Sequence, residues 1–323
     1  MTDIEAIATD SSVKMPNFLI IGAAKSGTTA VWHYLKQHPE IYMSSTKHTR
    51  FFAFNVEDPS FQGPAPTMRG PAGKNRSVPY AITDIEAYHA LFDGATNEIA
   101  IGEASHSYLY QPQAAQRIRN YASEMKLIAI LRNPAERAFS HYRQLVRDGR
   151  EPIPDFAQAL AEEEARIRDG WWPDFHYIQI GLYYGQLKRY FELFERDQLK
   201  IYLYEDLNSD PSGLSQDIFR FLGVDDSFIP QAAARYNASG MPKSRILHSV
   251  LQKLRQTMPI AERFLPEEQY RRLLRVGSSL HNQNLTKARL SPEVCRRTID
   301  EYFREDILKL EALIQRDLSA WLK

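Results

Sequence analysis

The stretch from Asn17 to Thr29, which reads NFLIIGAAKSGTT, constrains the fold more than any other part of the chain. Phe18 to Ile21 form an apolar run of the kind that fills a buried strand, and Gly22 ends the run. An amphipathic segment from Thr29 to Gln37 follows and predicts a helix. A strand that turns directly into a helix directs backbone N–H groups and the positive end of the helix dipole at one point. We therefore expect an anion site there, suited to phosphate.

This loop differs from the ATP and GTP phosphate loop in the position of its lysine. Gly22 and Gly27 have the spacing of that loop, but Thr28 stands where the lysine after the second glycine belongs. The nearby lysine is Lys25, inside the loop. The pattern favours nucleotide-type phosphate binding and disfavours an ordinary kinase or GTPase. A glycine-threonine turn that only caps a helix is the alternative interpretation.

A second strand-to-helix turn lies near the middle of the chain. Lys126 to Leu131 predict another buried strand, and a helix is expected from Pro134 through Arg147. Proline is well suited to the first helical position because its missing N–H has no partner there anyway. Arg132, through its planar fork, and Ser140, through its hydroxyl, can converge on one phosphate.

Both turns resemble the motifs of sulfotransferases that use 3′-phosphoadenosine 5′-phosphosulfate (PAPS). The sequence KSGTT resembles the 5′-phosphosulfate loop, although Ala24 stands where the family usually has proline, and LRNPAERAFSHY resembles the 3′-phosphate motif. The resemblance implies that Lys25 contacts the 5′-phosphate and stabilises the leaving group. It also implies that Arg132 and Ser140 bind the 3′-phosphate. The remaining phosphate donors that it implies are Ser26, Gly27, Thr28 and Thr29.

The general base is expected in a third segment. The sequence KHTRFF, which begins at Lys47, resembles a K-E-x-x-F-F segment of the heparan-sulfate-type and bacterial branches, where the glutamate is the base. His48 replaces that glutamate, and histidine is a competent base near neutral pH. Lys47 would neutralise the sulfuryl oxygens or orient the base. The sequence GEASHSY resembles a second family segment, in which His106 and Glu103 are alternative bases and Glu103 is also a candidate structural residue.

Two later segments are assigned to the cofactor by resemblance. Tyr204 begins a YEDL sequence, where the family places a tyrosine near the adenine; a packed aromatic residue before a helix cap is the alternative. Residues 237–245 correspond to a loop that covers the 3′-phosphate and adenosine. Gly240 would give this loop flexibility, and Lys243 and Arg245 would bind the cofactor.

The order of elements predicts one α/β domain. A length of 323 residues allows about two domains, but strands alternate with helices along the chain. We expect a flexible lead over residues 1–15 and a single domain over 16–323, with a central, mainly parallel sheet flanked by helices. By resemblance this is the P-loop-like sulfotransferase fold, with ligands at the carboxyl ends of the strands. Residues 59–79 predict a substrate lid.

Further elements follow from local patterns. Residues 155–169 predict one acidic helix with Glu162, Glu163 and Glu164 on a solvated face. An aromatic patch that could bind the acceptor is expected at Trp171, Trp172, Phe175 and Tyr177. The other expected elements are helices at Asp84–Phe92, Tyr183–Phe194 and Ser212–Leu222, strands at Glu98–Ile101 and Lys200–Leu203, and a C-terminal helical stripe of Phe303, Ile307, Leu310, Leu313, Ile314 and Leu318.

Composition limits the partners and the compartment. The chain has 40 basic and 40 acidic residues, which gives no electrostatic case for nucleic-acid binding. Cys295 is the sole cysteine, so an intramolecular disulfide and a thiolate metal cluster are excluded, and we expect a buried structural thiol in a reducing compartment. The first fifteen residues lack the apolar region of a signal peptide, and the sequence has no apolar run of about 18 residues. These features predict a cytoplasmic, bacterial enzyme without a membrane span.

The predicted activity is transfer of the PAPS sulfuryl group to a hydroxyl or amine of a small-molecule or glycan acceptor. A sulfuryl group carries less negative charge than a phosphoryl group, so fixed cations and N–H donors are expected to suffice without a metal ion. The product would be adenosine 3′,5′-bisphosphate. The alternatives are a P-loop nucleotide kinase or NTPase, and a non-catalytic nucleotide-binding protein of the same fold. The sequence determines neither the acceptor nor the oligomeric state.

Overall fold

The computed structural model describes residues 14–57, 59–65, 80–231, 241–242, 269, 285–286 and 289–323. Most of the expected lead and most of the expected lid at 59–79 lie outside these residues. The same is true of the expected cofactor-covering loop at 237–245, of which only the strand β6 is described.

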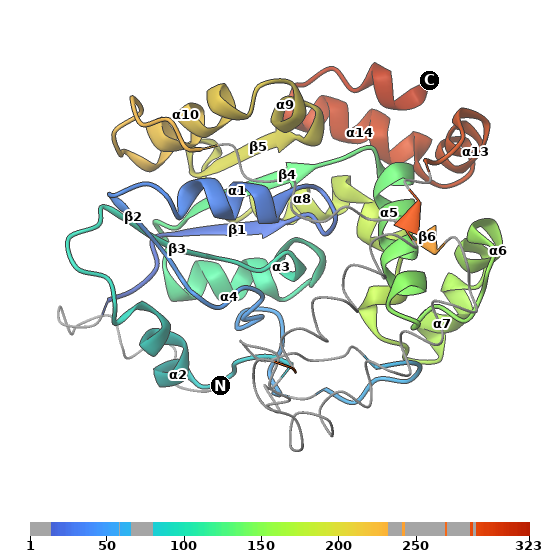
Figure 1. The fold of residues 1–323 in the computed structure, drawn as a ribbon, viewed down its shortest axis with the longest axis horizontal. Helices are drawn as coiled ribbons and strands as arrows, with labels where there is room; N and C mark the ends of the chain where they lie inside the picture. The colour runs from blue at the N-terminus through green and yellow to red at the C-terminus, as the bar shows by residue number, and fades with distance from the viewer. Residues whose placement is uncertain are drawn as a thin grey trace.

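A five-stranded parallel sheet forms the centre of the protein (Figure 1). Its strand order is β2-β3-β1-β4-β5. The strands are β1 Phe18–Gly22, β2 Ile41–Met43, β3 Ala100–Ala104, β4 Lys126–Leu131 and β5 Leu199–Leu203. A separate antiparallel pair joins β6 Met241–Pro242 to β7 Leu285–Thr286. The parallel sheet and its flanking helices confirm the predicted α/β class.

The strand expected at Glu98–Ile101 begins and ends later in the structure than the sequence predicts. β3 begins at Ala100, because the Glu98 carboxylate accepts a hydrogen bond from the Thr96 backbone N–H at 2.6 Å and holds a local turn. The strand then runs to Ala104. This shift brings Glu103 into the strand and leaves His106 just beyond its carboxyl end.

Both faces of the sheet are covered by helices, because successive strand residues point to opposite sides. Leu19 and Ile21 pack with α4, α8 and α14 on one face, while Phe18 and Ile20 pack with α1 and α10 on the other. The helices that flank the sheet are α1 Thr28–Leu35, α3 Ser107–Tyr110, α4 Ala114–Tyr121, α8 Tyr183–Phe191, α9 Tyr204–Ser209, α10 Pro211–Leu222 and α14 Arg304–Ile314. The strands are thus buried on both faces, as their apolar sequences predict.

The remaining helices lie mostly at the ends of the sheet. They are α2 Ile85–His89, α5 Pro134–Arg147, α6 Phe156–Ala161, α7 Glu163–Arg168 and α13 Pro292–Thr298. The expected C-terminal stripe is confirmed in that Phe303, Ile307, Leu310 and Leu318 are buried in the core. In Figure 1, α5, α6 and α7 stand together beside the carboxyl ends of the strands, and a third apolar cluster joins α5 to α6.

The single acidic helix expected over residues 155–169 is wrong in two respects. The segment forms two helices that meet at Glu162, and this turn points Glu163 inward. The Glu163 carboxylate is 2% exposed and accepts hydrogen bonds from the backbone N–H groups of Ile178, at 2.5 Å, and Gln179, at 2.8 Å. Glu163 is therefore a structural anchor and not part of a solvated face. Two aromatic residues of the expected acceptor patch, Phe175 and Tyr177, are also fully buried.

Candidate active site

The turn between β1 and α1 leaves a helix N-terminus free for a ligand. Gly27 is the N-cap of α1 and makes no side-chain cap, so the first N–H groups of the helix lack the usual partner. Its φ of 97° is a left-handed conformation that favours glycine. A Cβ at this position would lie 2.5 Å from Leu207 Cδ2. The sequence thus places glycine where both the backbone and the packing require it.

Two lysines flank this N-terminus. Lys25 Nζ donates to Gln144 Oε1 of α5 at 2.8 Å, and Lys47 Nζ donates to Thr29 Oγ1 at 2.8 Å. The pKa of each lysine is lowered to about 8 by burial, and for Lys25 the nearby charge of Arg147 contributes to this shift. An anion at the N-terminus of α1 would raise both pKa values, because it stabilises the charged ammonium form. The structure therefore joins Lys47 to Thr29 and places Lys25 in the same turn, against α5.

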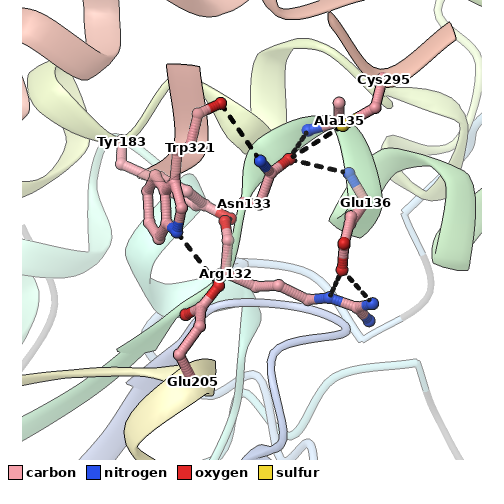
Figure 2. Close-up of polar contacts among 8 residues, drawn as sticks. All are labelled: Arg132, Asn133, Ala135, Glu136, Tyr183, Glu205, Cys295 and Trp321. Atoms are coloured by element: carbon pink, nitrogen blue, oxygen red, sulfur yellow. Dashed lines mark hydrogen bonds and ion pairs between the residues drawn. The ribbon is translucent and has the colours of Figure 1, made fainter. Parts of the chain in front are cut away.

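The turn between β4 and α5 is closed by its own side chains (Figure 2). The Asn133 side chain accepts hydrogen bonds from the backbone N–H groups of Ala135 and Glu136, both at 3.1 Å. Its amide nitrogen donates to the Trp321 carbonyl at 3.4 Å. Arg132 reaches back and forms an ion pair with Glu136 at 2.7 Å. The free N–H groups of this helix are satisfied within the protein, so an anion here must be held by side chains.

Ser140 connects the two turns through the face of α5. Side chains four residues apart in a helix lie above one another. Ser140 therefore lies between Glu136, which pairs with Arg132, and Gln144, which accepts from Lys25. Ser140 is 8% exposed on this face. The predicted partnership of Arg132 and Ser140 is compatible with this arrangement, provided that the ligand displaces Glu136 from Arg132.

The segment with the expected base has a strained backbone. His48 has a φ of 60° and Arg50 a φ of 56°, both in the left-handed region that non-glycine residues rarely adopt. Lys25 has a φ of 68°, so three of the four non-glycine residues with positive φ in the described chain lie at this site. Such conformations persist only where the surroundings hold them in place, and they cluster at functional sites.

The end of β3 holds this segment in place. The His48 N–H donates to the Ala104 carbonyl at 2.9 Å, and the Arg50 N–H donates to Ser105 Oγ at 3.2 Å. Thr49 Oγ1 donates to the Glu103 carboxylate at 3.1 Å. These contacts fix the orientation of the segment on the strand that carries the alternative base.

The contacts of Glu103 are those of a structural residue. Its carboxylate is fully buried and also accepts hydrogen bonds from Tyr108, at 2.5 Å, and Ser105, at 3.0 Å. Burial raises its pKa to about 7. The Tyr88 hydroxyl donates to the carboxylate as well, at 3.5 Å. Because four hydroxyl groups already donate to this carboxylate, the structural role of Glu103 is favoured over that of a base.

His48 and His106 lie against each other. Their ring centroids are 4.3 Å apart with an angle of 59° between the planes. Burial lowers the pKa of His48 well below 6.5, and the charges of Lys47, Arg50 and Lys25 act in the same direction. Burial lowers the pKa of His106 to about 3. Both rings are thus neutral at neutral pH, and the buried His48 Nδ1 has no hydrogen-bond partner among the described residues.

The Tyr204 ring lies beside the turn between β1 and α1, and one face of the ring is covered by Arg132. The Arg132 guanidinium stands 4.6 Å from the centre of its ring. The Tyr204 ring also lies next to Gly27. The predicted stacking on adenine would have to use the other face. Gly240, Lys243 and Arg245, the other predicted cofactor residues, lie outside the described residues.

Sequence reasoning missed the groups that position the predicted residues. Gln144 binds Lys25, Glu136 binds Arg132, and Thr49 joins the base segment to Glu103. The spacing of Arg132 and Glu136 is a signal in the sequence for their ion pair, because residues four apart at a helix start face each other. The other two contacts join segments far apart in the chain and have no local signal.

Comparison with known proteins assigns the family. A family model described as a sulfotransferase domain matches residues 15–261. A crystal structure of a sulfotransferase from Alicyclobacillus acidocaldarius is 36% identical, with a TM-score of 0.71, over 96% of this chain and 100% of that chain. This chain belongs to the sulfotransferase family, and the kinase or NTPase alternative is not favoured.

Curated relatives are more distant and longer. The membrane-associated sulfotransferase kil1 of Dictyostelium discoideum is 31% identical over 160 residues, which are 47% of this chain and 29% of that protein. The heparan sulfate glucosamine 3-O-sulfotransferase 3A1 of Mus musculus is 28% identical over 216 residues, 67% of this chain and 47% of that protein. The matches thus span less than half the length of these relatives.

Two further observations concern the residues that the structure describes. No group of three or more histidine, cysteine, aspartate or glutamate residues among them could hold a metal ion. None of their helices is long and apolar enough to span a membrane. Cys295 is half-buried, not fully buried as predicted, and its Sγ lies 3.9 Å from Asn133 Oδ1.

Proposed function

We propose that this protein transfers the sulfuryl group of PAPS to a hydroxyl or amine of a small-molecule or carbohydrate acceptor. The observation that carries the proposal is the uncapped N-terminus of α1, flanked by Lys25 and Lys47, with His48 close enough to experience both charges. Two cations and a free helix N-terminus suit a phosphosulfate. A neutral imidazole beside them suits the deprotonation of an acceptor.

The residues divide into three roles. Lys25, with Ser26, Gly27, Thr28 and Thr29, would hold the 5′-phosphate and the bridging oxygen. Arg132 and Ser140 would hold the 3′-phosphate, with Tyr204 near the adenine. Lys47 would bind the sulfuryl oxygens. His48 would be the general base, with His106 as its packing partner and alternative. Gly240, Lys243 and Arg245 would complete the cofactor site.

The proposed reaction conserves atoms and charge. A bond forms between the acceptor oxygen or nitrogen and sulfur, and the bond from sulfur to the 5′-phosphate oxygen breaks. The electron pair of that bond leaves with adenosine 3′,5′-bisphosphate, where Lys25 stabilises it. The acceptor proton passes to His48 and then to solvent. No residue in this scheme needs a metal ion, and metal independence is part of the proposal.

Replacement of His48 tests the base. His48→Ala should lower turnover about 10²–10⁴-fold, because general base catalysis contributes that much. Affinity for adenosine 3′,5′-bisphosphate should be unchanged. The acidic limb of the wild-type rate profile should lie below pH 6.5, since the pKa of His48 is lowered by burial. His48→Glu should recover part of the activity, since a carboxylate is also a competent base. The measurement is transfer of ³⁵S from labelled PAPS across a panel of acceptors.

His106→Ala is the matched control. The two rings touch, so both substitutions disturb the packing, but only the base should change the acidic limb. An inactive His106→Ala enzyme beside an active His48→Ala enzyme would assign the base to His106 instead.

Titration calorimetry separates the proposal from its competitors. Adenosine 3′,5′-bisphosphate should bind without magnesium and more tightly than ATP. Tight magnesium-dependent binding of ATP would favour the kinase or NTPase alternative. Binding without turnover of PAPS on any acceptor would favour a non-catalytic protein. The cytoplasmic location and the bacterial origin stay predictions, which cell fractionation and genome sequence would test.

A further inference from the structure

A group of polar and aromatic side chains lies near His48 and His106. We call Arg50, Tyr80, Arg150, Trp172 and Asp174 the acceptor-side cluster. The Arg50 guanidinium lies 4.0 Å from the centre of the Tyr80 ring and donates to the Tyr80 carbonyl at 2.8 Å. Arg50 is two residues from His48, so the cluster begins at the predicted base.

Electrostatic contacts connect the cluster to both histidines. The charges of Arg50 and Asp174 act on His106, and those of Arg50, Asp174 and Arg150 act on Tyr80. Arg50, Asp174 and Arg150 are therefore all near Tyr80, and Arg50 and Asp174 are also near His106. They come from segments that are distant in sequence and meet only in the fold.

Aromatic rings form one part of this region. Tyr80 and Trp172 have ring centroids 5.0 Å apart, and Trp172 and Phe61 have centroids 4.9 Å apart. The Trp172 backbone N–H donates to the Gln62 carbonyl, so the start of the expected lid, at 59–65, is attached to this ring. Such rings can pack against the apolar face of a ligand ring.

Buried polar atoms without partners point to a ligand. Among the described residues, Arg150 Nη2, Trp172 Nε1 and His48 Nδ1 have no hydrogen-bond partner. Arg150 is only 8% exposed, although its other nitrogens donate to Asp174 and to the Pro64 carbonyl. Buried polar groups are normally satisfied, so the two donors and the imidazole nitrogen indicate that the oxygens and hydroxyl groups of a ligand complete them.

The two cations of the cluster, Arg50 and Arg150, already have partners within it. Arg150 forms an ion pair with Asp174 at 2.5 Å, and Arg50 is covered by Tyr80 and bound to its carbonyl. A ligand carboxylate or sulfate would have to face the Asp174 carboxylate or take Arg150 from it. Either event has a cost in binding free energy.

We propose that the acceptor-side cluster binds an uncharged sugar unit, which it presents to His48. The proposal rests on the proposed function. The aromatic rings pack against the apolar face of the sugar, and Trp172 Nε1 and Arg150 Nη2 donate to its oxygens. Asp174 accepts from its hydroxyls and excludes acidic sugars. One free hydroxyl then reaches His48 Nδ1, where its proton is removed.

Two probes that differ in charge test this proposal. They are 4-nitrophenyl β-D-glucoside and 4-nitrophenyl β-D-glucuronide, with 4-nitrophenol as a probe without sugar. Saturation-transfer difference NMR with saturating adenosine 3′,5′-bisphosphate measures binding without turnover. The glucoside should bind at least about tenfold more tightly than the glucuronide, a difference of about 1.4 kcal/mol. Equal binding of both, or binding of 4-nitrophenol as tight as that of the glucoside, overturns the proposal.

Variants assign the selectivity to residues. Trp172→Ala should weaken glucoside binding about tenfold, and Trp172→Phe, which keeps a ring and loses the N–H, should weaken it less. Asp174→Asn should reduce the discrimination against the glucuronide about tenfold, because it removes the repelling charge and frees Arg150. Asp169 is an exposed aspartate nearby in sequence, and Asp169→Asn should leave the affinity for both probes unchanged. Unchanged selectivity in Asp174→Asn contradicts the charge argument. Affinity for adenosine 3′,5′-bisphosphate reports that each variant is folded.

The failures of the two proposals differ. If the glucoside binds with the expected selectivity and PAPS is never turned over, the cluster proposal stands and the proposed function fails. If PAPS is turned over on acceptors whose affinity is unchanged by substitution of Trp172 and Asp174, the proposed function stands and the cluster proposal fails.

Discussion

The two strand-to-helix turns look alike in sequence, yet they prepare for an anion in opposite ways. After β1, the helix begins at an uncapped glycine, and Lys25 and Lys47 stand beside it with lowered pKa values. After β4, Asn133 caps the helix and Arg132 is already paired with Glu136. The first turn is an open site at an uncapped helix N-terminus, and the second is a closed site whose arginine must exchange one partner for another.

This difference suits the two ends of a nucleotide donor. At the reacting end, donors that need no rearrangement can stabilise charge as it develops. At the far end, binding is needed but no charge changes, so an exchangeable ion pair is sufficient. The comparison therefore predicts that changes at the first turn affect catalysis and that changes at the second affect affinity.

Lys25→Ala should give the largest effect. Loss of a preorganised donor at the leaving group typically lowers turnover by about 10²–10³-fold. Affinity for adenosine 3′,5′-bisphosphate should fall less, because the lysine acts mainly on charge that develops in the transition state. Rates with labelled PAPS and calorimetry with the product measure the two effects. Lys188→Ala, an exposed lysine on α8, is the control. Near-normal turnover of Lys25→Ala would contradict the proposed mechanism.

Arg132→Ala should come next and should act on affinity. Loss of a charge-assisted contact costs about 1.5–3 kcal/mol, roughly ten- to hundred-fold in affinity. The loss should be seen with adenosine 3′,5′-bisphosphate and not with adenosine 5′-monophosphate, and Ser140→Ala should behave in the same way to a smaller extent. Glu136→Gln should change affinity in the opposite direction, because it frees the arginine. Equal losses for both nucleotides would contradict the 3′-phosphate assignment.

A pH dependence should follow from the open turn. In the free protein Lys25 and Lys47 have pKa values of about 8, so above that pH they lose the charge that attracts phosphate. Affinity for adenosine 3′,5′-bisphosphate should therefore be nearly constant below pH 7 and fall as the pH rises, by about tenfold per pH unit for each lysine. Calorimetry at several pH values in buffers of different ionisation enthalpy would count the protons taken up. Binding without proton uptake at pH 9 would mean that the lysines stay charged in the free protein.

Asn133→Ala should have the smallest effect, on stability. Loss of a helix cap costs about 1 kcal/mol of the free energy of unfolding. Urea denaturation would measure it, with the exposed Asn120→Ala as the control. Turnover at saturating substrate should change little. A loss of catalysis as large as that of Lys25→Ala would abolish the distinction between the two turns.

Local signals made the two strand-to-helix turns predictable. The apolar runs in the sequence correspond to the buried strands β1 and β4. Asn133 caps α5 and Pro134 is its first residue, and both residue types are typical of a helix start. The sulfotransferase family follows from these two turns together. Their residues are close in sequence, so their arrangement is set by the local backbone.

Most of the proposed acceptor-side cluster has no local signal in the sequence, which singled out only Trp172, as part of an aromatic patch. Asp174 comes close enough to His106 for its charge to act on that ring, although the two residues are far apart in the sequence. Glu163 shows the same limit, since three consecutive glutamates indicate a solvated surface and only the packing of Ile178 and Gln179 turns one of them inward. The environment of such side chains depends on tertiary packing, which a short stretch of sequence does not determine.

The contact between Trp321 and the turn after β4 has a practical consequence. The Trp321 indole N–H donates to Glu205, and its carbonyl accepts from Asn133, next to Arg132 (Figure 2). Lys323 follows two residues later. Immobilising the enzyme on a surface through Lys323 should therefore apply force to the turn after β4, where we propose that the 3′-phosphate binds. The same feature makes Trp321 a natural fluorescent reporter, because its emission should respond when a nucleotide draws Arg132 away from Glu136.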